Sequence, residues 1–339
     1  MTTRAPATAP RRDSQAGLTL IELMVSVVIV SIAVSAALTL GYTMMNSYHN
    51  QRRMALVERG ARVSLQILAR SIRNASAGVP SGNVGDSVGC TTTGAIRVIN
   101  SSTAPDEIEI IHASGGVITS SRAAYNSSDT SLVVLHGAEF RPGDYAIISD
   151  LNQGHLVQIT AVTQTSAAPD EKWTLTTNNP GCGGAFPTGG YKSGSLVLRA
   201  KIERFYVSTG PEVAGIPTLM VDPDGGGPLP PEPVAQGVED MQIAVGVDVN
   251  GDGTVTDNGT TADEWYYNAA GDAAPPLMSA KPWRAIRITF VARSVNETSK
   301  KTTSTRPPVE DRAGATAADQ YRRRVLSATI EVRNLTGSP

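Results

Sequence analysis

The 339-residue chain carries 29 basic and 31 acidic side chains, and its pI is near 6.1. This balance excludes a typical nucleic-acid-binding protein, whose basic surface usually raises the pI above about 9. Glycine (32 residues) and proline (21 residues) are frequent and aromatic residues make up 5% of the chain, which favours a turn-rich β protein over a helical or disordered one. The two cysteines are too few to build a zinc, haem or iron–sulfur site.

The N-terminus contains a long apolar segment. Residues 1–17 are polar and include three arginines, whereas residues 18–40 form an apolar run with a single charge. A helix over this run would span about 34 Å, enough to cross a hydrocarbon core of about 30 Å. The run exceeds the roughly 7–15 apolar residues of an ordinary signal peptide. We therefore expect a transmembrane helix, with residues 1–17 on the cytoplasmic side because arginines favour that side.

Glu22 is the single charge in this apolar run. A carboxylate at membrane depth costs several kcal/mol unless it is paired, so such a group usually has a function. A simple membrane anchor would need no such residue. The position of Glu22 therefore predicts that this residue has a function.

The string GLTLIE at residues 17–22 resembles the class III signal of type IV pilins, in which a short basic leader ends in glycine and a glutamate is the fifth mature residue. The resemblance implies that prepilin peptidase cleaves between Gly17 and Leu18 and that Leu18 is N-methylated. It also implies that Glu22 pairs with the N-terminal amine of a neighbouring subunit. Leu18 is a departure, because the first mature residue in this family is most often Phe or Met.

The helical pattern continues beyond the apolar run and becomes amphipathic. At 100° per residue, five apolar residues fall within an arc of about 80°; they are Val57, Ala61, Leu65, Leu68 and Ile72. The opposite arc carries Arg59, Arg62, Gln66, Arg70 and Arg73. We expect one helix to about Asn74, membrane-spanning over residues 18–41 and amphipathic over 42–74. Its apolar stripe is expected to dock on the following domain, and its arginine face is either solvated or in contact with partner subunits or lipid headgroups.

Residues 75–339 read as a β-rich extracytoplasmic domain. Short apolar runs alternate with turn residues, and no pattern of a crossover helix lies between them, which disfavours a doubly wound fold. The expected strands are 96–100, 107–111, 132–135, 145–149, 156–161, 173–176, 195–207, 238–249, 285–292 and 324–334. The segments 222–233, 248–271 and 298–320 are expected to be irregular. The sequence thus predicts an α+β fold in which antiparallel sheet packs on the C-terminal half of the long helix.

Three segments of the C-terminal half, 238–248, 283–294 and 321–334, resemble the minor pilin family PilW. The resemblance implies a pilin-like fold and a non-enzymatic structural subunit of a priming or tip complex that initiates type IV pilus assembly. The implied partners are other minor pilins, the major pilin, a large tip adhesin, prepilin peptidase and the inner-membrane assembly platform. The implied location is the inner membrane with a periplasmic domain before assembly, and the pilus tip at the cell surface afterwards.

Two alternatives stay open. The first is a J-type pseudopilin of a type II secretion system, which shares the N-terminal motif but is usually much shorter. The second is a membrane-anchored periplasmic binding or enzymatic module. The nucleophile-elbow pattern GDSVG at residues 85–89 has neither the preceding buried strand nor the following helix that an elbow requires, so it does not predict catalysis.

A segment beginning at Asp248 resembles a calcium-binding loop in its spacing. Asp248, Asn250 and Asp252 place side-chain oxygen atoms at positions 1, 3 and 5, and Gly253 stands at position 6. The glutamate expected at position 12 is replaced by Gly259. Residues that could close a non-standard site are Asp257, Asp263 and Glu264. The alternative is a tight turn without metal, since Asp, Asn and Gly favour turns. No other cofactor is expected.

Cys90 and Cys182 lie outside the membrane if residues 1–17 are cytoplasmic. An isolated pair in an oxidising compartment usually forms a disulfide. Closing a loop of about 93 residues would contribute up to about 4–5 kcal/mol on the entropy model. We therefore predict a Cys90–Cys182 disulfide, with two free thiols as the alternative.

Overall fold

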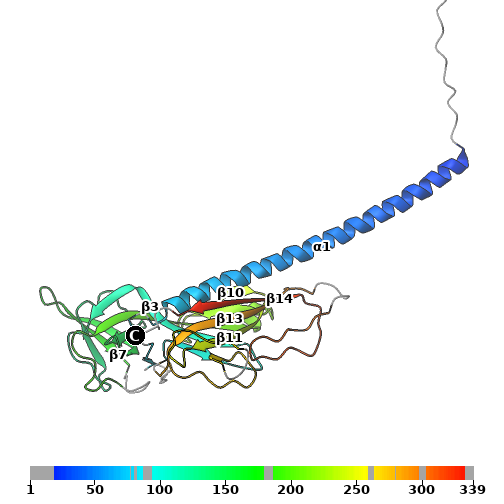
Figure 1. The fold of residues 1–339 in the computed structure, drawn as a ribbon. Helices are drawn as coiled ribbons and strands as arrows, with labels where there is room; N and C mark the ends of the chain where they lie inside the picture. Colours follow the sequence, from blue (N-terminus) through cyan, green and yellow to red (C-terminus); the bar gives the residue numbers. More distant parts are fainter. Residues whose placement is uncertain are drawn as a thin grey trace, which may run out of the picture. The chain divides into compact units, whose positions relative to one another are not determined.

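A computed structural model of the chain describes residues 19–76, 78–79, 82–86, 94–178, 186–258, 263–278, 280–297 and 303–332. One long helix precedes a series of mostly antiparallel strands (Figure 1). The expected α+β fold, with its long N-terminal helix and antiparallel sheet, is therefore confirmed. By internal contacts the chain divides into two units, Met1–Arg52 and Arg53–Pro339, and the boundary lies inside the helix.

Helix α1 runs from Leu20 to Asn74, and its last residue coincides with the end expected from the amphipathic pattern. The chain then turns at Ser76, whose φ is 61°. The Ser76 N–H donates to the carbonyl of Ile111 at 3.1 Å. The end of α1 is thus fastened directly to a strand of the domain.

The strands form two sheets. In the larger sheet the described strands are β1 (Val84–Asp86), β2 (Ile96–Ile99), β3 (Glu107–Ser120), β4 (Ser131–Val134), β5 (Tyr145–Ser149), β6 (Gly154–Ser166), β7 (Lys172–Thr177), β8 (Leu196–Ser208), β9 (Thr218–Asp222) and β10 (Glu232–Gln236). The smaller sheet has the order β12 (Trp265–Tyr266), β11 (Val238–Val247), β13 (Trp283–Arg293) and β14 (Arg323–Glu331). A 3₁₀ turn, η1 (Pro211–Val213), connects β8 to β9.

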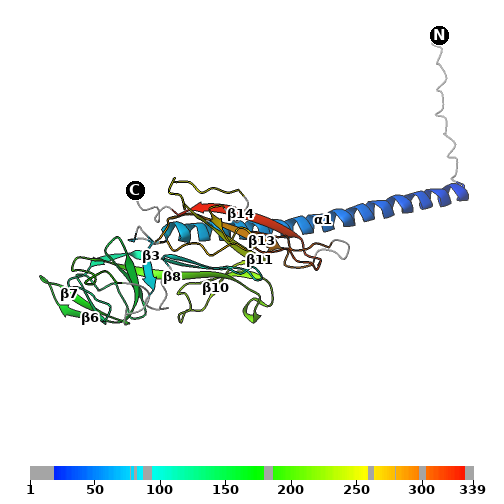
Figure 2. The same ribbon diagram turned by 60° about the horizontal axis from the view of Figure 1, so that its bottom comes forward.

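The main core lies between the two sheets and the C-terminal part of α1. The helix contributes one face to it, which includes Val57, Ala61, Leu68, Ala69 and Ile72. The strands contribute mainly Ile, Val and Phe from β2, β3, β8, β11 and β13. Figures 1 and 2 show this part of α1, in light blue, running along β13 and β14. The predicted docking of the apolar stripe on the sheet is confirmed.

A second core lies inside a closed ring of strands that the sequence did not reveal. The ladder runs β8–β5–β6–β7–β4, β3 also pairs with β8, and a bridge between Ser121 and Val134 joins the end of β3 to β4. The ring encloses apolar side chains such as Leu132, Ile148 and Leu175. Strands β6 and β7 lie at the end of this unit away from β14 (Figures 1 and 2).

Two segments expected to be irregular contain strands. Strand β10 includes Pro233, which is tolerated because β10 lies at the sheet edge and has a bulge between Pro233 and Ala235. Strand β12 lies within 248–271 because Trp265 is buried against β11. In segment 298–320, the described residues form isolated bridges, Ser304–Asp319 and Val309–Arg312, as expected for an irregular connection.

Candidate functional site

The N-terminal half of α1 presents apolar side chains on all sides. Every large apolar residue from Leu20 to Tyr48 is exposed, with Ile21 at 71% and Leu40 at 58%. The helix is long and apolar enough to cross a membrane. Such a surface is stable only when lipid or other protein covers it. The predicted cleavage and methylation residues, Gly17 and Leu18, lie outside the described residues.

Glu22 lies in the first turn of α1, where the partial positive charge of the helix N-terminus favours a carboxylate. Its N–H donates to the carbonyl of Thr19 at 3.1 Å. In the described part of the chain, no ion pair or side-chain hydrogen bond engages its carboxylate. The predicted pairing of Glu22 with the N-terminal amine of a neighbouring subunit stays a prediction.

The C-terminal half of α1 is held to the domain by polar contacts as well as by its apolar face. The Ser71 hydroxyl donates to Glu203 Oε2 on β8 at 2.6 Å, and His112 Nε2 on β3 lies 3.3 Å from the same oxygen. Burial opposes ionisation of Glu203, but the hydrogen bonds from His112 and Ser71 outweigh it and lower its pKa. The arginine face, with Arg59, Arg62 and Arg70, is exposed.

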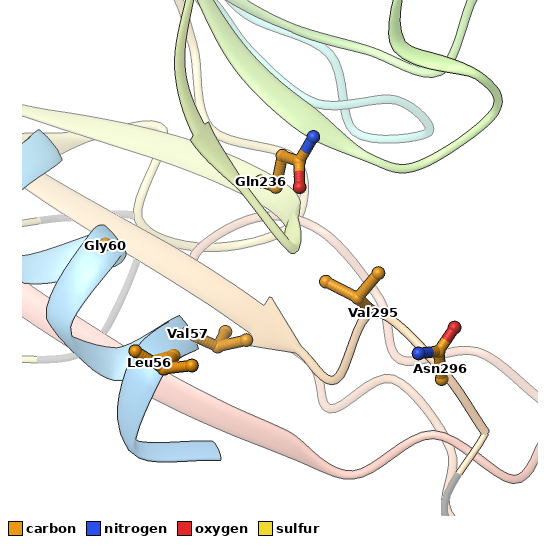
Figure 3. Close-up of a pocket in the computed structure, with 6 residues that line it drawn as sticks. All are labelled: Leu56, Val57, Gly60, Gln236, Val295 and Asn296. Carbon is orange, nitrogen blue, oxygen red and sulfur yellow. The ribbon is translucent and has the colours of Figure 1, made fainter. Parts of the chain in front are cut away.

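A groove of about 370 Å³ lies beside this half of the helix (Figure 3). Its lining residues are Leu56, Val57, Gly60, Gln236, Val295 and Asn296. Figure 3 shows the helix residues on one side, with Gln236 at the end of β10 and Val295 after β13 on the other. A Cβ on Gly60 would lie 3.6 Å from the Ala235 Cβ, an ordinary van der Waals contact, so Gly60 faces β10 across the groove.

The groove continues into an exposed apolar stripe on α1, defined by Leu56, Gly60, Val63 and Ile67. At 100° per residue these positions fall within about 60° of one another. Leu56 is 60% exposed, Val63 44% and Ile67 40%. The stripe lies between the buried face and the arginine face. Sequence analysis missed it, although the helical spacing of these residues is the signal that could have found it.

The predicted calcium loop is closed by hydrogen bonds. Asp248 Oδ1 accepts from Gly251 N–H at 2.7 Å and Oδ2 from Gly253 N–H at 3.0 Å, while the Arg284 guanidinium lies 2.9 Å from Oδ2. Burial opposes ionisation of Asp248, but Arg284 and the two backbone donors outweigh it and lower its pKa. A cation already neutralises the carboxylate that would be the first calcium ligand.

The other predicted ligands do not converge on Asp248. Asn250 and Asp252 hydrogen-bond each other at 3.0 Å, and Asp257 lies 2.9 Å from Arg287. Among the described residues no group of three His, Cys, Asp or Glu side chains could hold a metal ion. The residues therefore fit a turn closed by hydrogen bonds, and calcium binding stays an untested prediction.

Glu264, which the sequence offered as a closing ligand, instead organises the loop backbone. Its Oε1 accepts from the N–H groups of Val249 and Asn250, at 3.1 and 3.2 Å, and its Oε2 accepts from Thr256 at 2.9 Å. One buried carboxylate thus satisfies three backbone donors. Glu264 therefore closes the loop, and no glutamate at position 12 is needed.

Both cysteines of the predicted disulfide, Cys90 and Cys182, lie outside the described residues. Strands β2 to β7 fall between them in sequence. The Cys90–Cys182 disulfide therefore stays a prediction.

Two family models match the chain. The model described as type IV pilus-assembly protein W (PilW) matches residues 204–334, and the prokaryotic N-terminal methylation motif matches residues 12–38. The PilW match begins on β8, earlier than the residue 238 at which the sequence resemblance began.

A search of solved structures gives a type IV-like pilin from Thermus thermophilus, which is 16% identical and covers 57% of this chain and 85% of its own; its TM-score of 0.23 is too low to carry an argument. No curated protein matches significantly. The methylation motif and the apolar helix fit an inner-membrane-anchored pilin. Together, the two family matches support a PilW-like type IV pilin.

Proposed function

We propose that this protein is a minor pilin that joins the complex priming type IV pilus assembly and stays at or near the pilus tip. One observation carries the proposal: a single helix is fully exposed and apolar in its N-terminal half, yet forms part of the domain core in its C-terminal half. A subunit that moves from membrane to filament needs a helix that can exchange lipid for protein neighbours. The matches to the PilW family and to the methylation motif support the same role.

In this proposal, prepilin peptidase removes residues 1–17 and Leu18 becomes the methylated N-terminus. The Glu22 carboxylate then pairs with the N-terminal ammonium of a neighbouring subunit. Both charges are costly in an apolar helix bundle, so each stabilises the other far more than it would in water. The pair therefore specifies how far one helix is displaced along the next.

The groove beside Gly60 and the exposed stripe on α1 would extend this contact beyond the membrane. An apolar side chain from a neighbouring helix could occupy the groove, and the stripe would pack along the same helix. The partners in this proposal are other minor pilins, the major pilin, a large tip adhesin and the inner-membrane assembly platform. The domain is periplasmic before assembly and at the cell surface afterwards, and the role needs no cofactor.

The proposal is tested by deleting the gene and counting surface pili by electron microscopy. We expect few or no pili, restoration by the wild-type gene, and labelling of pilus ends by antibodies to the domain. Normal pili combined with lost protein secretion would instead indicate a pseudopilin.

A steric variant tests the groove directly. Gly60→Leu places a bulky side chain in the groove and should reduce incorporation into sheared pili by at least tenfold. Arg59→Leu, which adds the same side chain to the exposed arginine face one residue away, is the matched control and should assemble normally. Equal incorporation of the two variants would show that the groove is not an assembly contact.

A further inference from the structure

Strand β14 forms one edge of the smaller sheet. It pairs only with β13 in the described structure, in an uninterrupted antiparallel register from Arg323–Arg293 to Glu331–Ala285 without a bulge. An edge strand presents a row of backbone N–H and C=O groups that can pair with another chain. The long free edge of β14 is therefore a ready template for a further strand.

The hydrogen bonds at both ends of β14 show which residues face this edge. Val332 N–H donates to the Arg284 carbonyl at 3.0 Å, and Ser294 N–H donates to the Arg322 carbonyl at 2.9 Å. Directly opposite residues that exchange hydrogen bonds alternate with those that do not. The even-numbered residues of β14 thus bond to β13, and Val325, Ser327 and Thr329 direct their backbone N–H and C=O groups to the free edge.

Two other edge strands, β10 and β12, carry features that discourage strand addition. Strand β10 contains Pro233 and a bulge, and β12 has only two residues. Proline, bulges, charges and short length are the usual ways in which proteins protect an edge. Between Arg324 and Glu331, β14 reads VLSATI, six residues without a charge or a proline.

The side chains along β14 indicate what kind of strand would fit. On the face toward the core, Leu326 and Ala328 are only half-buried, although Ile330 is 2% exposed. Apolar side chains from an added strand would cover Leu326 and Ala328 fully. At the beginning of the strand, Arg322 and Arg324 are exposed. Among the described residues, Arg324 pairs only with the partly exposed Glu58, at 3.2 Å. This end of the edge is therefore basic.

We propose that β14 binds an extended segment of a partner protein as an added antiparallel strand. The segment carries alternating apolar side chains that cover Leu326 and Ala328, and an acidic residue beside Arg324. Main-chain hydrogen bonds hold the strand, and its side chains set the specificity. The proposal goes beyond the pilin role, since it assigns a second, separate docking surface.

Charge argues against a second copy of this chain as the occupant. Side chains directly opposite each other in an antiparallel pair lie on the same face of the sheet. Glu331 lies on the face opposite to that of Arg324, because the two residues are an odd number apart. A second β14 therefore offers no carboxylate to Arg324, whereas a partner strand with an acidic end does.

The test uses the full-length protein in detergent and a fluorescent peptide, Val-Thr-Val-Thr-Val-Thr-Glu, whose glutamate lies opposite Arg324 when the peptide pairs antiparallel. Ser327→Pro removes an outward N–H in the middle of the edge and leaves the bonds to β13 intact. Ser327→Ala is the matched control, because it also loses the hydroxyl that hydrogen-bonds Thr289 but keeps the N–H. By fluorescence anisotropy, we expect Ser327→Pro to bind at least tenfold more weakly than wild type and Ser327→Ala to bind within about twofold of it.

A charge exchange tests the acidic end. Arg324→Glu should bind the glutamate-ended peptide at least fivefold more weakly, and should bind a lysine-ended peptide better than the wild type does. Absence of binding, or equal binding by the proline and alanine variants, would overturn the proposal. Dimerisation of the wild-type protein that Ser327→Pro abolishes would also overturn it, because the occupant would then be a second copy.

Discussion

The two halves of α1 have the same backbone but different surroundings. Between Leu20 and Tyr48 the large apolar side chains are exposed, whereas Leu68 and Ile72 are completely buried in the domain core. The N-terminal half is apolar all round, and the C-terminal half is apolar mainly on one face. The difference shows that helical structure alone does not define the role of a segment. The angular distribution of its apolar residues does, because it sets how many sides must be covered.

The largest effect on stability is expected in the C-terminal half of α1, called the docked half below because it packs on the domain. Leu68→Ala should lower the free energy of unfolding of the domain by about 2–5 kcal/mol, since it leaves a cavity in the core. Ile67→Ala, at a neighbouring position that is 40% exposed, should cost less than about 0.5 kcal/mol. Urea unfolding followed by tryptophan fluorescence measures this, because all three tryptophans lie in the unit that begins at Arg53. Equal losses would show that the docked half does not pack as described.

The predicted Cys90–Cys182 disulfide should stabilise the domain on which the docked half packs. Cys182→Ser is expected to lower the free energy of unfolding of the domain by about 2–4 kcal/mol, because the reduced chain gains freedom when unfolded. Peptide mass mapping after alkylation without reductant should recover Cys90 and Cys182 joined. Recovery of both as alkylated thiols would contradict the prediction.

The stability of the domain on which the docked half packs should depend on pH. Burial raises the pKa of Asp106 in the domain core to about 8, despite hydrogen bonds from the N–H groups of Ser101 and Ile243. The folded state then holds a proton that the unfolded state releases near pH 4, so stability falls as pH rises from about 4 to about 8. Between these two pH values the fall should be about 1.4 kcal/mol per pH unit. Asp106→Asn should flatten this slope, and the exposed variant Asp150→Asn should keep it.

The smallest effect is expected from calcium. Because Arg284 and backbone N–H groups already engage Asp248, about 1 mM calcium should stabilise the domain by less than about 0.4 kcal/mol, the gain for a ligand present at its dissociation constant. Differential scanning calorimetry with calcium and with chelator measures the difference. A larger stabilisation by calcium that is lost in Asp252→Ala would show that the loop binds calcium.

The sequence predicted the features that depend on local pattern. The amphipathic stripe of α1 and strands such as β5 and β13 follow from side-chain spacing, and Glu22 stands out because charge is rare in an apolar run. The closed ring of strands was missed because the Ser121–Val134 bridge depends on residues brought together by the fold. The short strand β12 was missed for the same reason, since Trp265 is buried only by its pairing with β11.

The candidate assembly surfaces divide in the same way. The groove joins Leu56 and Gly60 on the helix to Gln236 and Val295, which lie far away in sequence, so no local pattern could assemble it. The free edge of β14 depends on strand order, which spacing does not encode. In contrast, the composition of the Asp248 loop is equally suited to a calcium site and to a turn. The structure favours the turn, because Arg284 and the N–H groups of Gly251 and Gly253 engage Asp248.

The central claim is that Glu22 in the N-terminal half of α1 serves assembly, whereas the buried face of the C-terminal half serves the fold. Glu22→Ala tests it most directly, with Glu22→Gln as the uncharged variant of similar shape. Removing one member of a buried ion pair costs about 3–5 kcal/mol, which corresponds to two to three orders of magnitude in an assembly equilibrium. We expect quantitative immunoblots to show both variants at wild-type levels in membranes but at least a hundredfold reduced in sheared pili, with unchanged urea unfolding of the domain. Wild-type amounts of either variant in sheared pili would contradict the account.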